Sequence, residues 1–124
     1  MPSQRVPRSE WLRFFEEFSR RHDGWLVTVR VLSPNFGSQV QARDLPLEGI
    51  VSTADGLGPI SIHVGASANS NIEHEIAEPK QVWLEISETG AEVALGIMSE
   101  DETRTIVEFR APSLPENVDG ILHV

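Results

Sequence analysis

The sequence predicts an α+β domain in which one N-terminal amphipathic helix packs on a curved antiparallel sheet. Three observations support this: one segment with a helical period of 3.6, a change to period 2 after Gly24, and no further helical segment beyond that glycine. Parallel strands need long crossover connections, usually helices, so we expect an antiparallel meander of seven or eight strands. The pattern fits both a barrel-like and a sandwich-like sheet.

With 124 residues and 13.8 kDa, the chain has the size of one domain. Residues 1–8 contain two prolines and two arginines without periodicity, and we expect a flexible arm there. Residues 9–110 form the predicted α+β domain. Residues 111–124 are expected to be a C-terminal tail that packs on the domain or extends it.

The helix is expected to begin at Ser9, a good N-cap, and to end at Gly24. Its apolar arc makes it the main filling of the core, and Glu17 and Arg21 are expected to pair on its solvent side. His22 lies on the apolar arc, where a structural role is expected. The residues of the arc are Trp11, Leu12, Phe14, Phe15 and Phe18.

Period-2 segments follow the helix to the end of the predicted domain. The sequence ADGLG at 54–58 is typical of a hairpin connection, and Pro46 favours an edge strand or the start of a strand. The predicted strands are residues 25–32, 38–43, 45–52, 60–64, 72–77, 81–87, 91–98 and 104–110.

The chain is acidic, with 10 Lys and Arg against 19 Asp and Glu and a net charge of −9. This charge opposes attraction to phosphates, so no nucleic-acid partner is expected. The bases are concentrated near the N-terminus, where they either dock on acidic strands of the same chain or meet a partner or an anionic ligand. The set comprises Arg5, Arg8, Arg13, Arg20 and Arg21.

The composition also limits location and cofactors. The chain has no cysteine, which excludes disulfides and thiolate metal sites and fits a reducing compartment. Its apolar runs are far shorter than the ~20 residues needed to span a bilayer, so we expect a cytoplasmic protein without a membrane partner. Phosphate-binding and dinucleotide-binding motifs are absent or broken, and no cofactor is expected.

One polar cluster is a candidate site for chemistry. If residues 60–64 pair with 72–77, His63 shares a face with Glu73 and Glu75, away from the isoleucines. A histidine near two carboxylates could bind a divalent metal or act as an acid/base pair, which gives the alternative prediction of a small enzyme. The other interpretation is an exposed cross-strand charge pair, and no metal ligand set is assigned. His74 alternates toward the isoleucines as a core histidine.

Trp83 is the candidate binding residue on the sheet. It alternates away from Val82, Leu84 and Ile86, so it lies on the opposite face of its strand. Either the helix covers that side or the exposed tryptophan marks an interface. The favoured function is a non-catalytic binding or protein-interaction module with an unknown small-molecule ligand, with a second copy or another protein as its partner.

Two resemblances add to this. The segment DLPLEG at 44–49, with upstream arginines, resembles motifs of PilZ domains, which implies cyclic di-GMP contacts by Arg8, Asp44 and Gly49. The segments WLRFFEEFSRRHDGWLVTVRV (11–31), RDLPLEGIV (43–51) and TRTIVEFR (103–110) resemble a family of small uncharacterised bacterial domains. That resemblance implies a bacterial protein and brings no activity or catalytic residues.

Overall fold

The computed structural model describes residues 3–65 and 71–113, which form one helix, one short 3₁₀ segment and eight strands. The elements are β1 (Ser3–Val6), η1 (Arg8–Glu10), α1 (Trp11–Arg21), β2 (Leu26–Ser33), β3 (Gly37–Val51), β4 (Ile60–Val64), β5 (Ile72–Ile76), β6 (Pro79–Ile86), β7 (Glu92–Ser99) and β8 (Arg104–Ser113).

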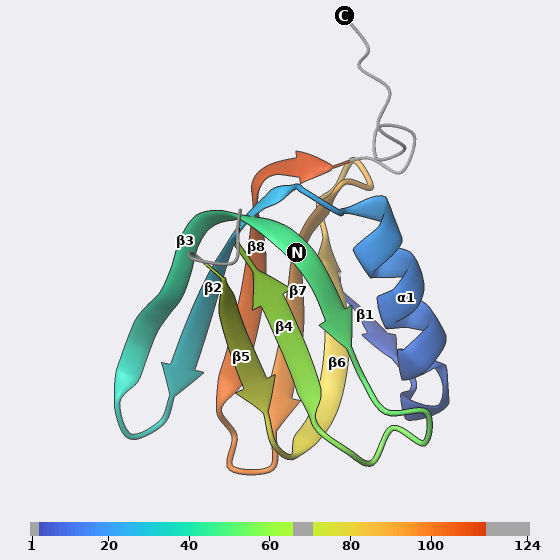
Figure 1. The fold of residues 1–124 in the computed structure, drawn as a ribbon, viewed down its shortest axis with the longest axis vertical. Helices are drawn as coiled ribbons and strands as arrows, with labels where there is room; N and C mark the ends of the chain where they lie inside the picture. The colour runs from blue at the N-terminus through green and yellow to red at the C-terminus, as the bar shows by residue number, and fades with distance from the viewer. Residues whose placement is uncertain (1–2, 66–70, 114–124) are drawn as a thin grey trace, which may run out of the picture.

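The strands form one antiparallel sheet in the order β1-β6-β7-β8-β2-β3-β4-β5. The sheet bends at β3, which pairs first with β2 and then with β4, so β3, β4 and β5 lie as a front layer over the remaining strands (Figure 1). The predicted antiparallel sheet with an N-terminal helix is therefore confirmed. Within the described residues the sheet is open, with β1 and β5 at its edges.

The expected single meander is wrong in its connectivity. The structure has two meanders, β2 to β5 and β6 to β8, and they join because β8 returns to pair with β2. Residues 77 and 78 carry the chain from the front layer to the back layer. Period 2 reports which residues face inward, but it does not report which strands become neighbours.

Three local expectations also differ from the structure. Ser3–Val6, within the expected arm, is an edge strand on β6, and Ser9 lies in η1 instead of capping α1. Pro46 lies inside β3 as the last residue paired with β2, just after a stretch, from Val40 to Leu45, where the pairing register with β2 is irregular. The expected strands 38–43 and 45–52 are therefore one bent strand, because such an irregularity bends a strand without ending it.

The helix fills the core as the sequence predicts. Trp11, Phe15 and Phe18 are each at most 1% exposed and pack with the inward-facing residues of both layers. Leu12, expected on the apolar arc, is 36% exposed. Figure 1 shows α1 beside the second half of β3, on the side of the molecule where β1 and β6 also lie. The helix thus occupies the open side between the layers.

Ser19 joins α1 to β3. Its hydroxyl accepts a hydrogen bond from the Ile50 N–H at 2.8 Å and donates one to the Ile50 carbonyl at 3.2 Å. Here β3 has left β2, whose pairing ends at Pro46, so these backbone groups face the helix. One side chain therefore satisfies both polar groups of a residue that has Ile62 of β4 on one side and no β2 neighbour on the other.

We expect Ser19→Ala to lower the free energy of unfolding by about 1–3 kcal/mol, because the Ile50 backbone groups would be left without partners. Urea denaturation measures this change. Ser38→Ala, at an exposed position of β3, is the control and should change stability by less than about 0.5 kcal/mol. Equal stabilities of the two variants would contradict the assigned role of Ser19.

Candidate functional site

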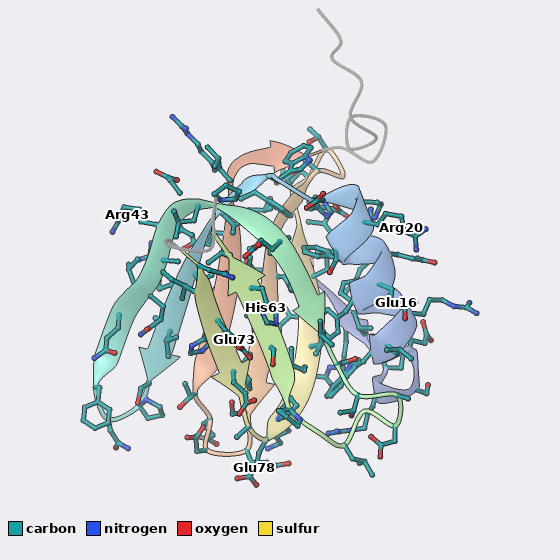
Figure 2. The ribbon with its side chains drawn as sticks, in the orientation of Figure 1. Glu16, Arg20, Arg43, His63, Glu73 and Glu78 are labelled. Carbon is teal, nitrogen blue, oxygen red and sulfur yellow. The ribbon has the colours of Figure 1, made fainter. Side chains whose placement is uncertain are left out.

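The predicted pairing of His63 with the acidic strand is present. In the register of β4 and β5, His63 lies opposite Glu73 on the outer face of the front layer (Figure 2). Glu75 lies opposite Ser61 in the same register. The alternation predicts Ile60, Ile62, Val64, Ile72 and Ile76 on the inward face; four of them are buried, and Ile72 is 36% exposed. A shallow hollow of about 260 Å³ adjoins His63 and is lined also by Glu48 and Asn71.

The arrangement of the described residues adds nothing to the metal or acid/base chemistry suggested for His63, Glu73 and Glu75. Within residues 3–65 and 71–113, no group of three or more His, Asp or Glu side chains is arranged to hold a metal ion. The ion pairs found in that part of the chain involve Arg21, His22 and Arg30 with Glu92 and Glu108. A metal or acid/base role for His63, Glu73 and Glu75 stays a prediction.

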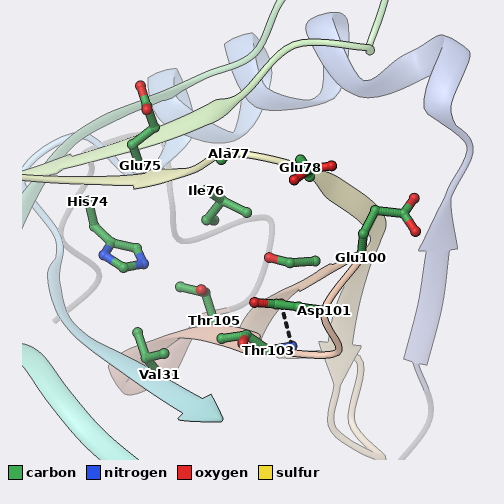
Figure 3. A pocket seen from close by; sticks show the side chains of 11 residues that line it. Val31, His74, Glu75, Ile76, Ala77, Glu78, Glu100, Asp101, Thr103 and Thr105 are labelled. Carbon is green, nitrogen blue, oxygen red and sulfur yellow. Dashed lines mark hydrogen bonds between the residues drawn. The ribbon is translucent and has the colours of Figure 1, made fainter.

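His74 opens onto a separate pocket of about 240 Å³ (Figure 3). The pocket lies between edge strand β5 and the inner face of β2 and β8, represented by Val31 and Thr105, with Glu100 and Asp101 at its rim. Asp101 accepts a hydrogen bond from the Thr103 N–H at 3.0 Å, which orders this turn. Burial lowers the pKa of His74, because the charged ring loses hydration, so the ring favours its neutral form.

A second polar cluster is buried where α1 ends. His22 is fully buried, with Nδ1 2.9 Å from the Phe18 carbonyl and Nε2 2.9 Å from Glu92 Oε2. The guanidinium of Arg21 donates to Glu92 Oε1 at 3.0 Å. The ring of His22 also lies 4.6 Å from that of Phe109. This cluster fastens the helix to the start of β7, which confirms the structural position expected for His22.

Glu92 was not singled out by the sequence, which pairs Arg21 with Glu17. The structure turns Arg21 toward β7, and Glu92 is only 5% exposed. Burial alone would raise the pKa of Glu92, but the hydrogen bond from His22 and the charge of Arg21 outweigh it and lower the pKa below its ordinary value. The signal available in the sequence was weak, because Glu92 is one of many glutamates.

Trp83 lies on the outer face of the back layer, half-buried, and the helix packs on the other side of that layer. Its indole covers Gly96 of β7: a Cβ atom at Gly96 would lie 2.1 Å from Cε2 of the ring. Only glycine leaves room for the ring at this position. Of the two expectations for Trp83, cover by the helix is therefore wrong.

Trp83 stands in a row of side chains that crosses five strands. The pairing registers place Arg5, Trp83, Gly96, Ile106 and Arg30 side by side on β1, β6, β7, β8 and β2. The neighbouring row, on one side, contains Gln81, Met98, Arg104 and Leu32. We call the two rows, with Glu85 and Glu108 on their other side, the Trp83 face.

Three hollows meet on the Trp83 face, with volumes of about 490, 480 and 430 Å³. Arg104 lines all three, and Trp83 and Leu32 each line two. Arg5 lines the largest hollow together with Trp83 and Arg104. The hollows therefore form one continuous shallow groove across the strands.

The arginines of this face differ in their partners. Arg30 Nε donates to Glu108 Oε1 at 2.9 Å, whereas the ion pairs found among the described residues include neither Arg5 nor Arg104. Arg8, by contrast, lies over the Trp11 ring at 4.5 Å and donates to the carbonyls of Gly56 and Pro79. Arg8 and Arg21 therefore contact other parts of the same chain, whereas Arg5 is exposed on β1, and a partner or anionic ligand for these bases stays a prediction.

Comparison with known proteins gives the family. Residues 2–118 match a family of unknown function, DUF5335. The chain belongs to this family. The chain is also similar to an uncharacterized protein of Aquifex aeolicus (strain VF5), with 23% identity over 116 residues that cover 93% of this chain and 97% of that protein. No solved structure matches the chain.

Membership in DUF5335 confirms the resemblance to a family of small uncharacterised domains and assigns no residue a role. The three residues named by the PilZ resemblance each have a different neighbour. Arg8 donates a hydrogen bond to the carbonyl of Gly56, and the Asp44 N–H donates one to the Thr28 hydroxyl. Gly49 lies next to Ser19. No helix in the described residues is long and apolar enough to cross a membrane.

Proposed function

We propose that this protein is a non-catalytic interaction module that binds another protein through the Trp83 face. The observation that carries the proposal is the groove, in which three hollows meet at Arg104 beside a half-buried tryptophan. The ring of a tryptophan on the outer face of a sheet is apolar, so its burial against a partner is favourable.

The composition of the face supports the proposal. Protein interfaces are enriched in Trp, Met and Arg, and the residues that dominate their binding energy are often Trp and Arg. The Trp83 face holds Trp83, Met98 and three arginines, with Leu32 and Ile106 as further apolar surface. The outer face of the front layer, by contrast, carries His63, Glu73 and Glu75.

The test is photo-crosslinking from two matched positions. A photoreactive phenylalanine derivative replaces Gln81 on the Trp83 face or Ser61 on the outer face of the front layer, both half-buried on β-strands. The purified variants are irradiated in extract of the cells that produce the protein. We expect discrete adducts from position 81 and none from position 61.

Trp83→Ala, combined with the crosslinker at 81, should reduce the adduct yield at least about tenfold if Trp83 is an anchor worth more than 1.4 kcal/mol. An adduct of twice the chain mass would identify a second copy as the partner. Equal adduct patterns from 81 and 61, or adducts that survive Trp83→Ala, would overturn the proposal.

A further inference from the structure

From the charges of the Trp83 face we infer that its partner is an acidic polypeptide segment that carries apolar anchor side chains. The inference rests on the proposed interaction function and names the chemistry of the partner. Two arginines without an ion-pair partner among the described residues, Arg5 and Arg104, line the same hollow as Trp83 and Met98. That hollow therefore offers two positive charges beside an apolar floor.

The charge of the largest hollow is opposite to that of the molecule. In that hollow Arg5 and Arg104 stand with one acid, Glu85, whereas the chain as a whole has a net charge of −9. Elsewhere on the face Arg30 pairs with Glu108, and Glu102 lines the neighbouring hollow, to which Arg104 also belongs. Complementary potentials guide association, so a segment rich in Asp and Glu is the partner that this face attracts.

A second copy of the chain fits less well. A second Trp83 face would bring no carboxylates in excess of its own arginines, and two chains of net charge −9 repel each other at a distance. The arginines of the face attract the phosphates of a nucleic acid, but a long nucleic acid is repelled by the net negative charge of the protein. A short acidic segment meets the arginines without covering the acidic remainder of the protein.

The dimensions of the face set the length of the segment. From Arg5 on β1 to Arg30 on β2 the row crosses four strand spacings, or about 19 Å at ~4.8 Å each. An extended peptide of about six residues covers this distance at ~3.3 Å per residue. Alternate side chains of such a peptide point to one side, so two leucines in the middle can contact Trp83 and Ile106 while carboxylates two positions further along in each direction reach the arginines.

The experiment measures fluorescence anisotropy of labelled peptides of about eight residues with the full chain. The probe places two Leu at alternate positions in its middle and Asp or Glu at the alternate positions toward its two ends, with Ser between them, so that all four side chains point to one side. One control replaces each Leu by Ser, and another replaces each acid by Lys. We expect binding of the acidic leucine peptide, with at least about tenfold weaker binding of both controls. ATP serves as a competing small anion.

Matched charge reversals locate the site. Arg104→Glu is expected to weaken binding of the acidic leucine peptide at least about tenfold, a loss of about 1.4 kcal/mol. Arg20→Glu changes the net charge equally, at an exposed position on α1 (Figure 2), and is expected to leave binding within about twofold. Circular dichroism of each variant checks that the fold is intact, and Arg5→Glu provides a second reversal should Arg104→Glu not fold.

Equal losses with Arg104→Glu and Arg20→Glu, tight binding of the serine peptide, or displacement of the peptide by ATP at equal concentration would overturn the acidic-segment inference. Crosslinked adducts from position 81 without peptide binding would leave the interaction face standing and reject only the partner chemistry. Absence of both adducts and peptide binding would reject the proposed function as well.

Discussion

Replacing Glu92 by alanine is expected to lower the free energy of unfolding by about 3–5 kcal/mol. The carboxylate is 5% exposed and lies between the guanidinium of Arg21 and the fully buried ring of His22. Its removal leaves His22 Nε2 without that carboxylate inside the core, and a buried polar group that loses its partner destabilises the folded state. Urea denaturation of Glu92→Ala against the unchanged chain measures the loss.

The same residue makes stability depend on pH. The pKa of Glu92 is lowered in the folded protein, so folding favours the ionised carboxylate. This contribution is fully present above the ordinary pKa of 4.5 and is lost as the pH falls below that value toward the folded pKa. Stability measured from neutral pH down to acid should therefore fall, and Glu92→Gln should flatten part of that fall.

Glu108→Ala is the matched control for Glu92→Ala. Glu108 also pairs with an arginine, Arg30, but the two side chains are 42% and 37% exposed. Solvent screens such a pair, so its removal should cost less than about 1 kcal/mol. If the two alanine variants lost equal stability, burial of the Glu92 cluster would not be the cause.

Phe18→Ala is expected to cost about 3–5 kcal/mol. The ring is fully buried, 4.4 Å from the ring of His22 and 5.8 Å from that of Phe109, so truncation leaves a cavity between the helix and the sheet. The cavity removes contacts on every side, because interiors are closely packed. Thermal or urea denaturation measures the change.

Phe36→Ala offers the same substitution at an exposed position. Phe36 lies between β2 and β3 and is 77% exposed, so its truncation should change stability by less than about 0.5 kcal/mol. A loss for Phe36→Ala as large as that for Phe18→Ala would mean that the helix does not fill the core as described.

The candidate sites show which contacts a local sequence pattern can predict and which it cannot. The pairing of His63 with Glu73 was predictable because strands 60–64 and 72–76 are neighbours in the chain and alternate strictly. The row of Arg5, Trp83, Ile106 and Arg30 was not, because it joins strands separated by up to about a hundred residues of sequence. Gly96 has no distinguishing context in the sequence, yet it provides the space under Trp83.

The sequence by itself determined the one aromatic helix, the antiparallel character of the sheet and the inward side of most strands. Each of these follows from a period within a short segment, and period is a property of the chain alone. The tertiary structure decided that β8 pairs with β2, that Ser3–Val6 joins the sheet, and that Glu92 meets His22. Such pairings depend on which apolar surfaces cover one another when the chain collapses, and many partners compete for each strand before that happens.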